Sequence, residues 1–145
     1  METSQIKSLL VGKSRKMMVR FLLLTAGVVL MILGLVIARD YLGVTLTAFV
    51  PQGISIYLIP AVFVLAAIYA YYNDGVVISW VIIFTPLFFA FVNYIGSGIA
   101  IGNNPTQIEW ILSSASGGLL YAIILGTFAF ILGAGSRRAI GFITR

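Results

Sequence analysis

Four apolar stretches, separated by short polar segments, dominate the pattern along this chain. They run approximately from Val19 to Ala38, Ile54 to Tyr72, Val76 to Ile101 and Ile108 to Ala134. At 1.5 Å of rise per residue, a helix over any of these stretches is about long enough to cross a hydrocarbon core of about 30 Å. The pattern therefore predicts an all-α integral membrane protein, with four transmembrane helices in a compact bundle.

The amino-acid composition supports a membrane protein and excludes several kinds of catalytic and metal-binding site. The chain is 61% hydrophobic and only 9% charged, whereas an ordinary soluble domain has about 25% charged residues. It has no Cys and no His, so thiol chemistry and imidazole metal ligands are excluded. We expect one domain over residues 1–145, because the termini and loops are too short for a second core. We predict no enzyme activity, catalytic residue, cofactor, metal site or nucleic-acid partner.

The positive charges are distributed very unevenly. Eight of the nine Lys and Arg residues lie at the two ends of the chain, and only Arg39 lies between the first two stretches. The eight are Lys7, Lys13, Arg15, Lys16, Arg20, Arg137, Arg138 and Arg145. The positive-inside rule places both termini in the cytoplasm, with residues 1–18 as a basic arm. Such an arm is either a topology determinant alone or a specific contact for a partner or for anionic lipid. Arg20, Arg137 and Arg138 would join it in a contact with anionic lipid headgroups.

The connections between the stretches carry turn and cap signals. Residues 73–75 read Asn-Asp-Gly, which predicts a tight turn and an antiparallel hairpin of the second and third helices. Around this turn we expect a belt of interfacial aromatic side chains. Thr106 is placed to cap the last helix, with Glu109 in its first turn. The connection over residues 39–53 is apolar and broken by Gly and Pro, which fits an interfacial connector or a re-entrant lid. The aromatic belt comprises Tyr69, Tyr71, Tyr72 and Trp80.

Small residues recur at helical spacing and predict close packing between helices. The stripe on the last stretch comprises Ser114, Gly118, Ala122, Gly126 and Gly133, and the first stretch contributes Gly27 and Gly34. On the third stretch, small and weakly polar residues form one face and aromatic residues the opposite face, which we expect to point toward lipid or an outer neighbour. Spacing leaves open whether the last stripe packs on the first span or on another subunit. The two faces of the third stretch are Ser79, Pro86, Ala90, Asn93 and Ser97, and Trp80, Phe84, Phe88 and Phe91.

Two functions remain compatible with the sequence. No acidic residue is predicted near the bilayer centre, which argues against a proton-coupled carrier. The packing stripes favour a non-catalytic accessory, assembly or structural component of a larger membrane complex or a homo-oligomer. The alternative is a small passive channel or carrier for a small solute, lipid or ion, with a polar path or interhelical bonds along one helix. The residues of that candidate path are Ser79, Thr85, Pro86 and Asn93.

Overall fold

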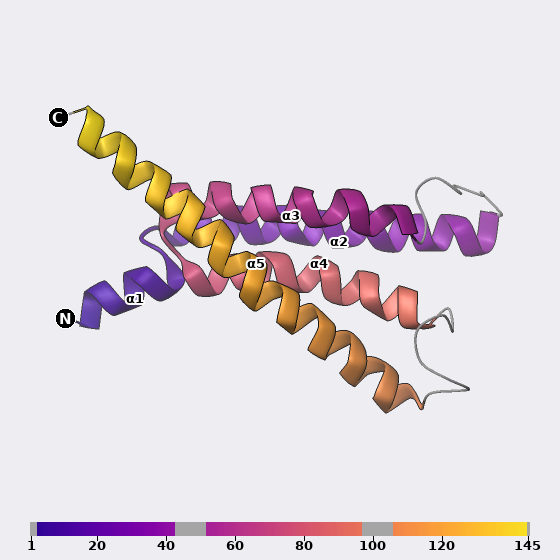
Figure 1. The fold of residues 1–145 in the computed structure, drawn as a ribbon. Helices are drawn as coiled ribbons and strands as arrows, with labels where there is room; N and C mark the ends of the chain where they lie inside the picture. The colour runs from indigo at the N-terminus through magenta and orange to yellow at the C-terminus, as the bar shows by residue number, and fades with distance from the viewer. Residues whose placement is uncertain (1–2, 43–51, 97–105, 145) are drawn as a thin grey trace.

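The computed structural model describes residues 3–42, 52–96 and 106–144, and these residues are almost entirely α-helical (Figure 1). The helices are α1 (Thr3–Val11), α2 (Arg15–Leu42), α3 (Gln52–Asn73), α4 (Val76–Gly96) and α5 (Gln107–Ile143). No strand occurs in the described residues. The predicted all-helical class is therefore confirmed for these segments.

The helix boundaries follow local signals in the sequence. At Asp74 the backbone adopts φ 57°, and this left-handed residue reverses the chain between α3 and α4, as the turn signal predicts. Thr106 and Glu109 form the predicted cap of α5 as a reciprocal capping box, in which the Thr106 amide donates to the Glu109 carboxylate over 2.8 Å. The cap prediction is confirmed. Gly12, at φ 103°, separates α1 from α2.

The helices extend beyond the predicted apolar stretches at several points. α2 begins at Arg15 and α5 continues to Ile143, so both enter the basic ends of the chain. The predicted basic arm is therefore divided between α1 and the first turn of α2. Residues 43–51 and 97–105, which include most of the expected connector or lid and the end of the third stretch, lie outside the described residues.

The core lies where α2, α3 and α4 meet, and α5 lies obliquely across α3 and α4 (Figure 1). Buried residues on α2, α3, α4 and α5 recur mostly every three or four positions, as expected for helices with one face turned inward. Phe21 of α2 contacts Tyr69 of α3 edge to face, with ring centroids 5.3 Å apart. The core cluster includes Phe21, Ile32, Val62, Ala66, Tyr69, Ile82, Ile83, Leu87, Ala122 and Ala129.

Two helical stretches, Ser8–Ala38 and Gln107–Ile143, are long and apolar enough to cross a membrane, judged by length and composition. Two more apolar helical stretches, Tyr57–Asn73 and Val76–Val92, are shorter. The chain ends lie at the same end of the bundle, together with the α3–α4 turn (Figure 1). This arrangement brings three distant parts of the sequence together.

Candidate functional site

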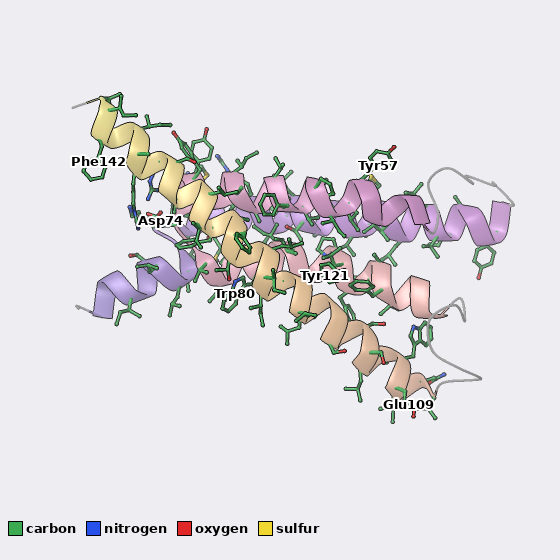
Figure 2. All side chains as sticks on the ribbon, in the orientation of Figure 1. Tyr57, Asp74, Trp80, Glu109, Tyr121 and Phe142 are labelled. Carbon is green, nitrogen blue, oxygen red and sulfur yellow. The ribbon has the colours of Figure 1, made fainter. Side chains whose placement is uncertain are left out.

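A cluster of polar residues joins the α1–α2 linker, the α3–α4 turn and α5 at one end of the bundle. We call it the terminal cluster. Figure 2 places Asp74 at this end, near α1 and α5. Each of the three segments contributes polar groups, although they are about 60 residues apart in sequence. Its members are Val11, Lys13, Ser14, Tyr69, Tyr71, Asn73, Asp74 and Arg137.

Asn73 holds the linker through both its backbone and its side chain. Its backbone carbonyl accepts from the Lys13 amide at 2.9 Å. Its side-chain oxygen accepts from the Ser14 amide at 2.5 Å, and its side-chain nitrogen lies 3.0 Å from the Ser14 carbonyl oxygen. These bonds satisfy linker groups that the break between α1 and α2 leaves without helical partners. Asn73 is fully buried, so the Asn73 end of these bonds is shielded from water, whereas Ser14 is half-buried.

Tyr69 reaches the same linker from one turn earlier on α3. Its hydroxyl donates to the Val11 carbonyl at 2.8 Å and accepts from the Asn73 side-chain nitrogen at 2.9 Å. Its side chain is fully buried. This position differs from the interfacial belt that the sequence predicts, because the aromatic ring fills the core and the hydroxyl bonds the linker. Tyr72, in contrast, is exposed.

Asp74 is the acidic centre of the terminal cluster. Its carboxylate oxygen Oδ2 lies 2.8 Å from the Lys13 ammonium and also accepts from the Arg137 guanidinium. Arg137 donates a further bond, of 3.1 Å, to the Tyr71 carbonyl. Burial alone would raise the pKa of Asp74, but the hydrogen bonds and charges of Arg137 and Lys13 outweigh it and hold the pKa below its ordinary value.

Two glycines make the close approach of these segments feasible. A Cβ atom at Gly12 would lie 2.5 Å from the Asn73 side-chain nitrogen, and one at Gly75 would lie 2.6 Å from the Tyr69 hydroxyl. Gly12 also has the left-handed backbone that side chains disfavour. The terminal cluster therefore depends on glycine at both positions.

The small-residue stripe of α5 packs on the aromatic face of α4. A Cβ atom at Gly118 would lie 3.4 Å from the Phe84 ring and from the Phe88 backbone. At Gly126 it would lie 2.5 Å from the Trp80 ring. The outer neighbour of the aromatic face is thus the chain's own last helix. Ser114, Gly118, Ala122, Gly126 and Gly133 are all buried.

Further along α5 the stripe passes from α4 to α3. At Gly133 an added Cβ would clash with the Ala67 carbonyl oxygen and would lie 2.8 Å from the Tyr71 amide. Both contacts are with backbone, so α5 and α3 touch most closely here. Within the described chain, the stripe packs mainly on α3 and α4 rather than on α2, the helix predicted to be the first span.

Hydrogen bonds from tryptophan fix α5 along α4. The Trp80 indole donates to the Thr127 hydroxyl at 3.1 Å, and the Trp110 indole donates to the Val92 carbonyl at 2.7 Å. The two bonds lie near opposite ends of α4. They fix the axial register of α5 against α4. Contacts between small residues alone would not fix this register.

The candidate polar path is only partly visible. Ser79 and Pro86 are buried on one face of α4, seven residues apart. The Ser79 hydroxyl donates to the carbonyl of Gly75, just before α4, and the Thr85 hydroxyl donates to the Val81 carbonyl within α4, both at 2.9 Å. Asn93 belongs to α4, but its side chain lies outside the described part. Among the described contacts, the Ser79 and Thr85 hydroxyls therefore bond only backbone close to them in sequence and make no interhelical bond.

Gly27 and Gly34 face away from the described bundle. A Cβ atom at either position would meet nothing within 4 Å. Large apolar side chains flank them on the same face of α2. Leu23 is 66% exposed and Leu30 is 68% exposed. The predicted packing role of these glycines has no partner within the described chain.

The predicted headgroup-binding cations whose side chains are described fall into two groups. Lys13 and Arg137 bond Asp74 in the terminal cluster. Arg15, Lys16, Arg20 and Arg138 are exposed near the same end of the bundle. Lys7 lies in α1, with its side chain outside the described part.

The sequence provides little signal for Asp74, Asn73 and Tyr69 as a site, because the turn motif explains the first two and an interfacial aromatic explains the third. A buried acid between distant cations is visible only in three dimensions. Comparison with family models, with curated proteins and with solved structures found no match. The functional argument therefore depends on geometry alone.

Proposed function

We propose that this chain is a multi-pass integral membrane protein that acts through contacts with other membrane subunits, or with further copies of itself, and not through catalysis. The observation that carries this proposal is the outer face of α2. There, Gly27 and Gly34 form an uncovered path between exposed leucines, whereas the corresponding stripe of α5 is covered by α3 and α4. A small-residue face within lipid allows a second helix to approach closely.

Membrane placement is supported by where the apolar surface lies. Only 22% of the most apolar window of the first long stretch is buried, and 33% of that of the second. A core helix of a soluble protein would bury most of that window, whereas a lipid-facing helix leaves its apolar side chains outside. α3 and α4, with 22 and 21 residues, would each reach about 30 Å along their axes.

The positions of the charged groups support an orientation with both chain ends on one side of the membrane. Asp74 and its two cationic partners lie at one end of the bundle. The exposed cations Arg15, Lys16 and Arg138 lie near the same end. The α3–α4 turn therefore shares one face with both chain ends, as four crossings require. We place this face in the cytoplasm by the positive-inside rule.

The proposal is tested by isolating the native assembly in mild detergent and measuring its composition and stoichiometry. We expect a stable complex that Gly34→Leu dissociates while the chain remains folded, because an added Cβ at Gly34 has no other described atom within 4 Å and the side chain continues outward from there. Ala61→Leu, at an exposed small residue of α3, is the matched control and should leave the complex intact.

Liposome flux separates this proposal from a passive channel or carrier. We expect no solute flux above that of protein-free liposomes. A monomer without partners, together with a flux that Asn93→Leu reduces, would contradict the proposal and favour conduction.

A further inference from the structure

Two helical segments project beyond the terminal cluster at the same end of the bundle (Figures 1 and 2). One is α1, which Gly12 turns away from α2. The other is the end of α5 beyond Arg137, where Phe142 lies near the tip in Figure 2. The sequence pattern places the last span only as far as Ala134, so this helical extension is a finding of the structure.

Both segments expose large apolar side chains where a soluble surface would be polar. On α1, Ile6 and Leu10 lie one turn apart and are 44% and 42% exposed. On α5, Phe142 and Ile143 are 81% and 84% exposed, and Ile140 is about half exposed. None of these belongs to the core of the bundle.

Unpaired positive charge lies between and beside the two segments. Asp74 is already bonded to Lys13 and Arg137, so it leaves Arg15, Lys16 and Arg138 without a neutralising carboxylate among the described contacts. Exposed apolar side chains next to cations, on short helices at the end of a bundle, are typical of surfaces that lie in the headgroup region of an anionic membrane.

We infer that α1 and the end of α5 form a two-part surface that binds the anionic leaflet, with the apolar side chains at the acyl boundary and the cations at the headgroup phosphates. This inference rests on the membrane placement proposed above. An anionic leaflet fits better than an acidic protein, because both segments continue from the long apolar helices and meet the leaflet where those helices leave it. The terminal cluster fixes the direction in which α1 departs.

The test uses the absence of cysteine, which allows single labels. The variants Ile6→Cys and Phe142→Cys carry a polarity-sensitive fluorophore, and Leu120→Cys, at an exposed site within α5, reports membrane insertion itself. Each protein is reconstituted in phosphatidylcholine, or in an equimolar mixture with phosphatidylglycerol, with brominated lipids as quenchers.

We expect labels at positions 6 and 142 to be quenched more strongly in the anionic bilayer, and the difference to shrink with added salt. Arg138→Gln should weaken the anionic preference at position 142 by about fivefold. Arg39→Gln, which removes a cation from the opposite end of α2, is the matched control. It should leave the anionic preference at position 142 unchanged.

Equal quenching in neutral and anionic bilayers, or none at positions 6 and 142, would overturn the inference. Shielding of those labels only by a co-purified acidic protein would overturn it as well. In each of these cases, quenching of the label at position 120 would show that the protein is still inserted in the membrane. No quenching at position 120 would contradict the proposed function itself.

Discussion

The carboxylate of Asp74 and the guanidinium of Arg137 bond each other across 63 residues of sequence. Asp74 lies in the turn between α3 and α4, and Arg137 lies near the end of α5. Lys13, from the linker before α2, completes the group. One buried acid thus connects three segments at the end of the bundle where the exposed cations also lie.

Replacement of Asp74 by asparagine should loosen this end of the bundle. The substitution keeps the side-chain size but removes the charge that Lys13 and Arg137 share. We expect a loss of about 1 to 3 kcal/mol in the free energy of unfolding, since Lys13 is largely exposed and solvent weakens its pair. Denaturant titration in micelles measures it. Glu109→Gln, at an exposed acid, is the matched control, with a smaller loss confined to the cap of α5. Equal losses would show that Asp74 has no special role.

The same carboxylate predicts a dependence of stability on pH. Because the pKa of Asp74 is lower in the folded protein than its ordinary value of 3.8, its contribution is complete above that value and is lost as the pH falls through the folded pKa. The charged groups that face this carboxylate are Lys13 and Arg137. The difference in unfolding free energy between wild type and Asp74→Asn should stay constant at neutral and mildly acidic pH, begin to fall as the pH drops below 3.8, and vanish below the folded pKa. A difference that changes near neutral pH would contradict this account.

Removal of the Tyr69 hydroxyl isolates the linker contact. Tyr69→Phe leaves the ring in the core but deletes the bond to the Val11 carbonyl and the acceptor for Asn73. We expect a loss of about 1 to 3 kcal/mol, because both hydrogen bonds of a buried hydroxyl are removed. Thermal unfolding followed by circular dichroism measures this. Tyr72→Phe, at an exposed tyrosine of the same helix, should have almost no effect.

Two glycine substitutions should have opposite consequences. At Gly133 a Cβ atom would meet the backbone of α3, which cannot move aside easily, so Gly133→Ala should destabilise by about 1 to 3 kcal/mol. At Gly27 the same substitution meets nothing within 4 Å, so Gly27→Ala should be neutral, or stabilising by at most about 1 kcal/mol. Resistance to unfolding by a denaturing detergent compares the two. A greater loss at Gly27 would mean that the helices pack differently.

Local patterns are sufficient to predict α2, α3, α4 and α5 and several of their ends, but not α1. The apolar stretches, the Asn-Asp-Gly turn and the cap formed by Thr106 and Glu109 each depend on residues close together in sequence. The stripe on α5 is likewise visible from spacing alone. Its buried position agrees with that pattern, although the pattern does not identify α3 and α4 as its neighbours.

Contacts between segments far apart in the sequence could not be predicted from local patterns. Tyr69 looks like an interfacial aromatic because nothing nearby reveals that its hydroxyl meets Val11. Asp74 looks like an ordinary turn residue because its cationic partners are about 60 residues away on either side. Gly27 and Gly34 have the spacing of a packing face, but spacing does not tell which chain covers it.

The orientation of the chain across a membrane is the most direct test of this account. Single cysteines near the N-terminus (Ser4→Cys), at the start of α5 (Thr106→Cys) and near the C-terminus (Thr144→Cys) can be labelled with an impermeant maleimide in sealed, oriented vesicles. The account predicts that positions 4 and 144 react from one side and position 106 from the other. Reaction of positions 4 and 144 from opposite sides, or of all three from the same side, would contradict it.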